Sequence, residues 1–338
     1  MASVSVVIPC FNAQRTLAVC VEALLANNVR PLEIILVDDA SSDPASPALA
    51  DALAASHPGL VRAIRLEKNG GPAVARNRGA AVACGTYLVF VDSDTKPSPD
   101  LVEKFLARIP EADAVSGIYA MEPLNDEPVA RYKAYLNYYA FSSEGVFAYE
   151  TFSASTAGIR ADVFAAHGGF DEKLAWGMDY ENEEFGRRII TRHRLLLDPA
   201  MTSQHLFPGF SKLTRTYFSR VALWMEFFLK NPKLESGGLA TPRIGIGTAA
   251  APAALGFAAL GFLWPGFFAA SAALLLVFGI CMAGFYGFVA RHRPGFLPSA
   301  IVLNIYFSSV IACGAAYGVM RSLAGRGRAA SAQIQTKP

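Results

Sequence analysis

Two aspartates one residue apart, Asp92 and Asp94, follow directly on an apolar run at residues 86–91, with Ser93 between them. A β-branched and aromatic run that ends in acids predicts a buried parallel strand. Such a strand delivers carboxylates to a sheet edge, where open α/β sheets bind their ligands. Two such carboxylates can hold a hard divalent cation, and a cation there would neutralise a diphosphate leaving group. A solvated Asp-Ser-Asp turn without a ligand is the alternative.

Strand and helix patterns alternate around this run. The expected strands cover residues 4–8, 32–37, 61–66 and 86–91, and the expected helices cover residues 17–25, 47–56 and 73–83. This alternation predicts an α/β fold with a doubly wound, mainly parallel sheet. The loops that follow the four strands then meet at one edge, and they are residues 9–12, 38–43, 67–71 and 92–94. No glycine fingerprint follows the first strand, which argues against a dinucleotide oxidoreductase.

The composition excludes some classes of protein. The 338 residues carry a net charge of +2, so we expect no basic nucleic-acid-binding surface and no nucleic-acid partner. The first residues lead straight into a strand pattern, so we expect no signal peptide. The five cysteines have no metal-like spacing and suit a reducing compartment. Charge is unevenly distributed, because residues 244–320 contain almost none outside Arg291, His292 and Arg293.

Two apolar segments, residues 244–263 and 267–289, are each long enough to cross a hydrocarbon core of about 30 Å. Basic residues before the first segment and after the second place both outer ends in the cytoplasm by the positive-inside rule. A third apolar segment, residues 297–320, either spans the bilayer or is re-entrant or interfacial. Its hydropathy favours spanning, and the arginines that follow it favour a re-entrant or interfacial arrangement, which keeps them in the cytoplasm. The predicted location is the inner membrane, as a multi-pass protein, and glycines in these segments would permit a homo-oligomer.

These patterns divide the chain into a cytoplasmic catalytic domain (1–232), a linker (233–243), a membrane region (244–322) and a polar tail (323–338). The catalytic domain ends in a helix at about 211–230 that carries Lys212, Arg215 and Arg220 among apolar and aromatic residues. Such a helix suits a membrane interface and an anionic headgroup, and a solvated face is the alternative. An aromatic run at residues 131–139 fits either an acceptor groove or a helix packed on the sheet.

Five sequence blocks resemble glycosyltransferase family 2, in the order of that family, whose catalytic domain has the GT-A fold. They are residues 5–12, 33–43, 69–79, 89–94 and an acceptor-side signature at 168–172 and 176–189, and the resemblance covers about residues 3–230. It implies inverting transfer of a sugar from a nucleotide sugar, with a pyrimidine nucleotide preferred, to a membrane-embedded acceptor. The family's Gln-x-x-Arg-Trp motif is absent, which argues against a processive polysaccharide synthase.

The resemblance also implies roles for single residues. Asp39 would accept from the ring N–H of the base, Pro9 and Phe11 would shape the base slot, and Arg76 would meet the phosphates. The expected nucleotide-binding residues are Pro9, Phe11, Asn12, Asp39, Arg76 and Ser93, and the expected ligands of Mg²⁺ or Mn²⁺ are Asp92, Asp94 and His205. A structural role is the alternative for His205. Asp43 has the alternative of capping its turn and the next helix.

The segment 176–189 supplies the expected catalytic residues Asp179, Glu181 and Glu184 and the acceptor-side residue Trp176. Asn182 stands where the family commonly has the Asp that deprotonates an acceptor hydroxyl, and an amide cannot take up that proton. An ionised phosphate needs no base, so this departure favours a polyprenyl phosphate acceptor over a sugar hydroxyl of a lipid-linked glycan. A catalytically silent nucleotide-sugar-binding protein is the third possibility. For Glu184 the alternative is an ion pair with Arg188 on the helix surface.

Overall fold

The computed structural model describes residues 2–142, 145–174, 180–229 and 241–335, and the chain forms two compact units. The sheet unit comprises Met1–Asn125 and Phe141–Phe207, and the helical unit comprises Asp126–Ala140 and Pro208–Pro338. The segment 126–140 and the helix expected at 211–230 therefore group with the C-terminal helices, whereas the sequence analysis placed both in the catalytic domain.

The parallel half of the sheet confirms the four predicted strands. It consists of β1 (Val4–Cys10), β2 (Glu33–Asp38), β3 (Val61–Arg65) and β4 (Tyr87–Val91), in the order β3-β2-β1-β4. β1 pairs in parallel with both β2 and β4, and β2 pairs in parallel with β3. The carboxyl ends of the four strands consequently lie at one edge of the sheet, as the alternation predicted.

The other half of the sheet is mixed. It consists of β8 (Thr156–Arg160), β6 (Ala114–Tyr119), β9 (Leu195–His205), β5 (Thr95–Pro97) and β7 (Phe147–Ala148), which pairs with β9. The strand-like pattern of the sequence ends at residue 197, and a proline such as Pro199 usually ends a ladder, yet β9 continues to His205. Its continuation is supported by β5, which pairs with it up to His205, and by a register shift opposite Pro199 in its pairing with β6.

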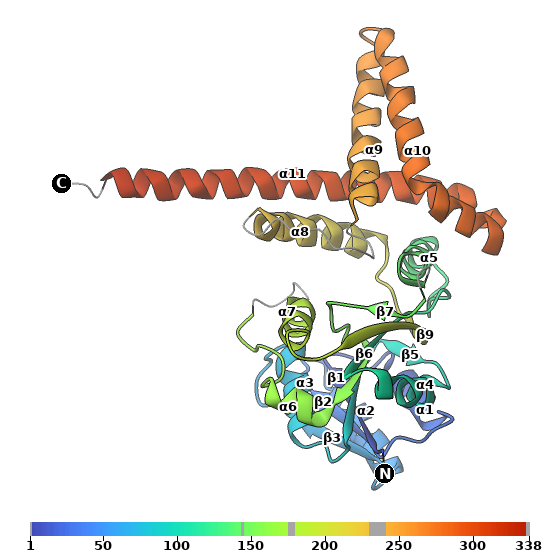
Figure 1. Ribbon diagram of the computed structural model, residues 1–338, viewed down its shortest axis with the longest axis vertical. Helices are drawn as coiled ribbons and strands as arrows, with labels where there is room; N and C mark the ends of the chain where they lie inside the picture. The colour runs from blue at the N-terminus through green and yellow to red at the C-terminus, as the bar shows by residue number, and fades with distance from the viewer. Residues whose placement is uncertain (1, 143–144, 175–179, 230–240, 336–338) are drawn as a thin grey trace. The chain divides into compact units, whose positions relative to one another are not determined.

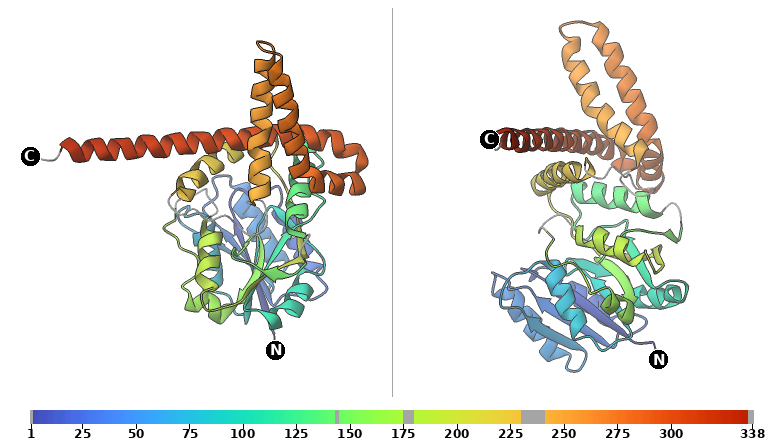
Figure 2. Two further views of the ribbon diagram at one scale, coloured as in Figure 1. Left: turned by 45° about the horizontal axis from the view of Figure 1, so that its top comes forward. Right: turned by 60° about the vertical axis from the view of Figure 1, so that its left-hand side comes forward.

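Alternate residues of the central strands face two separate cores. Val6 and Ile8 belong to the core beneath α1 (Leu17–Leu25), α2 (Ala45–Ser56) and α4 (Leu101–Arg108). Val7 and Phe90 belong to the core beneath α3 (Pro72–Ala81), α6 (Ala161–Ala166) and α7 (Tyr180–Ile189). Figure 2 shows helices on both faces of the sheet, so the predicted α/β architecture is confirmed.

The helical unit contains α5 (Pro128–Ser142), α8 (Phe210–Phe228), α9 (Pro242–Gly261), α10 (Gly266–His292) and α11 (Leu297–Gln335). α9 and α10 form a hairpin (Figure 1). Its turn carries Phe262, Leu263 and Trp264, which are 70–85% exposed. In the described chain, three helical segments are long and apolar enough to cross a membrane, and they are Pro242–Gly261, Gly266–His292 and Pro294–Leu323. They correspond to the three predicted apolar segments.

The aromatic run on α5 packs against other helices of the same unit, an arrangement that the sequence analysis did not consider. Tyr132 and Tyr135 are almost completely buried, and the rings of Phe285 and Phe288 on α10 lie about 6 Å from them. The Tyr132 hydroxyl donates to Asn304 Oδ1 on α11 at 2.9 Å, and the Asn304 amide donates to Tyr286 at 3.0 Å. The buried Asn304 therefore links three helices.

α8 runs alongside α11 (Figure 1), and small residues allow the two backbones to approach closely. Gly314 and Gly318 of α11 lie against the backbone of Phe218 and Ala222 of α8, with no space for a side chain at either glycine. The Phe218 ring also contacts the ring of Tyr317, with centroids 5.5 Å apart. An apolar helix is thus packed directly on a helix that exposes three basic side chains, Lys212, Arg215 and Arg220.

Candidate active site

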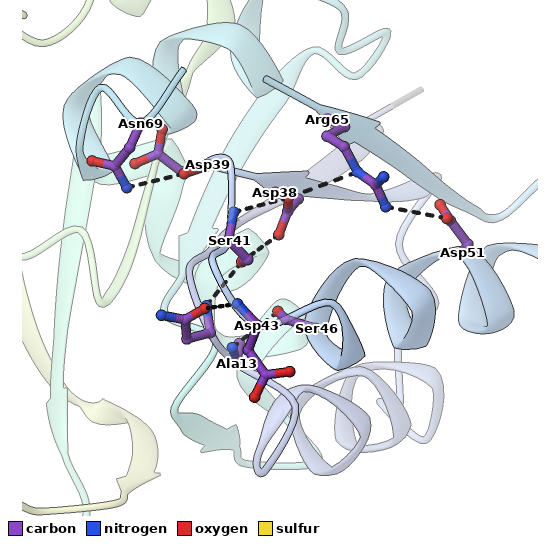
Figure 3. Close-up of polar contacts among 10 residues, drawn as sticks. Ala13, Asp38, Asp39, Ser41, Asp43, Ser46, Asp51, Arg65 and Asn69 are labelled. Atoms are coloured by element: carbon purple, nitrogen blue, oxygen red, sulfur yellow. Dashed lines mark hydrogen bonds and ion pairs between the residues drawn. The ribbon is translucent and has the colours of Figure 1, made fainter. Parts of the chain in front are cut away.

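Short polar side chains tie the loop after β1 to the loop after β2. Asn12, which has a φ of 52°, donates its backbone N–H to Ser41 Oγ at 2.9 Å and accepts from the backbone N–H of Asp43 at 2.9 Å. Ser41 in turn donates to Asp38 at 2.5 Å. Figure 3 shows the cluster around Asp38, Ser41 and Asp43. These contacts fix the conformation of the segment that carries the predicted base-slot residues.

Asp39 is buried at the end of β2 and holds the glycine loop that precedes α3. Its carboxylate accepts from the backbone N–H groups of Gly70 at 2.8 Å and Gly71 at 2.7 Å, while Asn69 donates to its carbonyl oxygen at 3.0 Å (Figure 3). Burial raises the pKa of Asp39, and the two N–H donors oppose that rise. A carboxylate offers about four lone-pair sites, so Asp39 keeps acceptor capacity for a further N–H.

Arg76 contacts two other predicted site residues, Asp92 and Glu181. It is only 4% exposed, and its guanidinium donates to Asp92 at 2.8 Å and to Glu181 at 3.3 Å. The ring of Phe170 lies 5.6 Å from the guanidinium carbon. Burial raises the pKa of Asp92, against the lowering effect of Arg76. A guanidinium held this way can present its fork of donors to phosphate oxygens.

Two residues that position Arg76 were missed in the sequence. Asn77 exchanges two hydrogen bonds with the backbone of Phe170, donating at 2.8 Å and accepting at 2.9 Å, which fixes the ring beside Arg76. Gly79 lies so close to Val7 of β1 that a side chain there would overlap it, and this brings α3 onto the sheet. Both residues belong to the family-like block 69–79, but nothing in that block points to a partner 93 residues away.

Asp94 and His205 also meet, because β5 pairs with β9. Thr95 lies opposite His205 in the ladder, and the Asp94 carboxylate is 3.3 Å from His205 Nε2. The His205 ring packs against Tyr119 and Phe207, with both centroids 4.5 Å away. Its Nδ1 is buried without a hydrogen-bond partner among the residues described.

The described parts of the chain contain no group of three His, Cys, Asp or Glu side chains that could hold a metal ion together. Asp94 and His205 are adjacent, whereas Asp92 is turned toward Arg76. Mg²⁺ commonly uses one or two carboxylates and takes its other ligands from phosphates and water. The donors present therefore fit a cation shared with a diphosphate and do not form a complete protein cage.

For Asp43 and Glu184, the observed contacts are those of the structural alternatives. Asp43 accepts from the backbone N–H of Ala45 at the start of α2 at 3.0 Å. Glu184 forms a bidentate ion pair with Arg188 at 2.8 and 2.6 Å, and Arg188 also donates to the Gly169 carbonyl at 2.8 Å. Glu184 thus stabilises the segment before α7, and its catalytic role stays a prediction without support from these contacts.

The remaining predicted residues occupy varied positions. Pro9 and Ser93 are half-buried, Phe11 is 43% exposed, and Lys212, Arg215 and Arg220 are exposed on α8 of the helical unit. Asn182 Oδ1 is buried and has no hydrogen-bond partner within the described ranges. Trp176 and Asp179 lie outside the described residues.

Residues 5–168 match the family model described as glycosyl transferase family 2. Glycosyltransferase GlyG of Streptococcus pneumoniae serotype 4 is 39% identical over 111 residues, which are 33% of this chain and 36% of GlyG. The succinoglycan biosynthesis protein ExoO of Rhizobium meliloti is 35% identical over 122 residues, which are 36% of this chain and 33% of ExoO. The chain thus spans about a third of the length of these curated relatives.

Among solved structures, mannosyltransferase PcManGT of Pyrobaculum calidifontis, in complex with GDP-Man and Mn²⁺, has a TM-score of 0.52 and 18% sequence identity. The similarity covers 90% of this chain and 87% of that one, and it is a likeness of fold. It agrees with the GT-A architecture expected for the sheet unit. The segment matched by the family model contains β1–β4 together with Arg76, Asp92 and Asp94. Residues 5–168 are therefore a family 2 glycosyltransferase domain, as the sequence blocks predicted.

Proposed function

We propose that this chain transfers a sugar from a nucleotide sugar to a polyprenyl phosphate at the cytoplasmic face of the inner membrane, with inversion at the anomeric carbon. The observation that carries the proposal is the buried Arg76, which is held between Asp92 and Glu181 at the carboxyl edge of the parallel strands. The glycosyltransferase relatives and the mannosyltransferase complex with GDP-Man and Mn²⁺ support a nucleotide-sugar donor.

The donor would be recognised by groups that are already in place. Asp39 would use its remaining acceptor capacity for an N–H of the base, beside Phe11 and Pro9. The guanidinium of Arg76 would bind diphosphate oxygens in its fork geometry. In the folded protein, Asp92 and Glu181 already compensate the positive charge of Arg76. A diphosphate that arrives with a divalent cation would therefore change the local charge little, because the cation offsets the charge of the diphosphate.

Asp94 and His205, with Asp92, would hold Mg²⁺ or Mn²⁺ together with the diphosphate. When bound, the cation supplies neutralisation of the charge that develops on the leaving nucleoside diphosphate. The contribution of the protein is placement, because the β5–β9 ladder sets Asp94 beside His205 before a ligand arrives.

The pairing of two of the three acids on α7 supports a phosphate acceptor. Glu181 is paired with Arg76, Glu184 is paired with Arg188, and Asn182 cannot take up a proton. A phosphate oxygen would attack the anomeric carbon while the bond from that carbon to the diphosphate oxygen breaks, and the leaving group takes the electron pair. This step moves no proton, so it needs no general base.

A sugar hydroxyl of a lipid-linked glycan is the second candidate acceptor. It is favoured by the likeness to ExoO, which is named for succinoglycan biosynthesis. It also requires a base, and Glu181 is the described α7 acid that lies at Arg76. The two candidates therefore differ in what removal of the Glu181 charge should do.

If Asp94 helps to hold the cation, Asp94→Asn should lower the rate of sugar transfer by about 10²–10³-fold, a loss typical of removing one electrostatic contact in an active site. Chelation by EDTA should also abolish activity, and added Mn²⁺ or Mg²⁺ should restore it. Asp51→Asn is the matched control, because Asp51 is an exposed acid paired with Arg65. Transfer should be followed with radiolabelled nucleotide sugars in isolated membranes. Undiminished activity in EDTA after exhaustive dialysis would rule out the cation.

If the acceptor is a phosphate, Glu181→Gln should reduce turnover less than the loss of about 10²–10⁴-fold that follows deletion of a general base. Glu184→Gln should lower thermal stability through the lost Arg188 pair and leave turnover close to that of the wild type. Turnover should be measured at saturating donor, with donor binding determined separately. A loss of three orders of magnitude in Glu181→Gln with intact donor binding would identify a hydroxyl acceptor instead.

For the membrane part, we propose that α9 and α10 span the bilayer as a hairpin and that α11 lies at the interface. α11 is packed backbone to backbone on α8 at Gly314 and Gly318, and α8 exposes Lys212, Arg215 and Arg220. Charged side chains are costly at the bilayer centre, so α8 and the stretch of α11 packed on it belong at the interface. The arginines after residue 320 then remain on the cytoplasmic side, in agreement with the positive-inside rule.

This arrangement predicts that the C-terminus lies on the same side of the membrane as both ends of the hairpin. A green fluorescent protein fused after Pro338 should be fluorescent, and an alkaline phosphatase fused there should be inactive, because that phosphatase needs export. The same phosphatase inserted at the Trp264 turn should be active and serves as the control. Active phosphatase at the C-terminus would show that α11 crosses the bilayer.

A further inference from the structure

A groove in the helical unit lies between α8 and α11 and plays no part in the proposed transfer. Its volume is about 390 Å³, and its accessible surface is almost entirely apolar. It is lined by Thr214, Arg215, Phe218 and Ser219 of α8 and by Tyr306, Ser309, Val310 and Cys313 of α11. Small-molecule sites typically measure about 300–1,000 Å³, so the groove is large enough for part of a lipid but not for a whole one.

Contacts at both ends define the shape of the groove. At one end the Thr214 hydroxyl lies 3.2 Å from the Tyr306 hydroxyl. At the other end the backbone of Phe218 touches Gly314, which follows Cys313 directly. Tyr306 and Cys313 are two helical turns apart on α11, which corresponds to about 10 Å of groove length. The groove is therefore elongated along α11 and apolar, which suits a segment of hydrocarbon chain.

Among the described residues that line the groove, Arg215 is the only charged one. It is exposed, and it forms no ion pair with any residue that the structure describes. Acidic residues are absent from the sequence of 297–323, so α11 cannot neutralise it. A water-soluble anion would leave the apolar wall uncovered, and a lipid without net negative charge would leave the positive charge of Arg215 unbalanced. An anionic amphiphile satisfies both surfaces.

We propose that this groove binds one hydrocarbon chain of an anionic membrane phospholipid, with its phosphate headgroup at Arg215. Cationic side chains beside an apolar helix face are the usual partners of such lipids at a membrane interface. The proposal rests on the interfacial position of α8 and α11 proposed above, and it is independent of the donor, the acceptor and the chemistry of transfer.

Cys313 provides a built-in probe, because it lines the groove and is exposed. The full-length protein should be placed in nanodiscs of phosphatidylcholine, with and without phosphatidylglycerol, and labelled with a small maleimide. Peptide mass spectrometry then gives the labelling rates of Cys313 and of Cys84, an exposed cysteine of the sheet unit that serves as the internal reference. Co-elution with the discs establishes membrane insertion separately, so failure of the membrane placement is distinguished from failure of the groove.

Phosphatidylglycerol should slow the labelling of Cys313 at least five-fold and leave that of Cys84 unchanged. Arg215→Gln should remove this protection, whereas Lys212→Gln, an equal loss of charge one turn away and outside the groove wall, should retain it. Val310→Trp, which fills the groove, should make labelling independent of lipid composition. Equal labelling in both kinds of disc, or equal protection in Arg215→Gln, would overturn the proposal. Protection by an added isoprenoid phosphate but not by phosphatidylglycerol would overturn it as well.

Discussion

A guanidinium that is 4% exposed can remain in the protein interior only if opposite charges replace its lost hydration. For Arg76 these charges are Asp92 at 2.8 Å and Glu181 at 3.3 Å, so one electrostatic constraint acts on three elements. β4 has to end beside α3, α3 has to lie against β1 at Gly79, and α7 has to pack onto the same core. The guanidinium that we propose binds the nucleoside diphosphate is thereby fixed in place before a ligand arrives, which is the pre-organisation that electrostatic catalysis requires.

In the helical unit, too, a buried polar group has partners that replace its lost hydration. Asn304 is buried among apolar helices, and its amide is satisfied by Tyr132 and Tyr286, which joins α5, α10 and α11. Arg215 differs, because no described residue pairs with it and the groove beside it is apolar. Asn304 therefore helps to hold three helices of this unit together, whereas the exposed Arg215 is the charge with which the proposed lipid would pair.

The sequence was sufficient where a signal is local. Strands that end in acids predicted the sheet edge and the positions of Asp92 and Asp94. The i,i+4 spacing indicated the Glu184–Arg188 pair as the alternative to a catalytic role for Glu184, and that pair is present. Contacts between residues that are far apart in the sequence could not be predicted from it. Asn77 fixes Phe170 from 93 residues away. Pro199 indicated a strand end, although β9 continues beyond it, where β5 and β6 pair with residues 202–205. The aromatic run of α5 did not reveal that α10 is its partner. The division into two compact units likewise depends on packing that sequence patterns do not encode.

The central claim is that Arg76 is the group around which the nucleotide site is built, and nucleotide binding tests it most directly. Isothermal titration of UDP and of GDP in the presence of Mn²⁺ should show that Arg76→Gln lowers the affinity of the preferred nucleotide by at least ten-fold. Arg76→Lys should restore little of it, because an ammonium cannot reproduce the bidentate fork. Arg78→Gln, at an exposed position two residues along α3, should bind like the wild type. Equal affinity of the wild type and Arg76→Gln for both nucleotides would contradict the account.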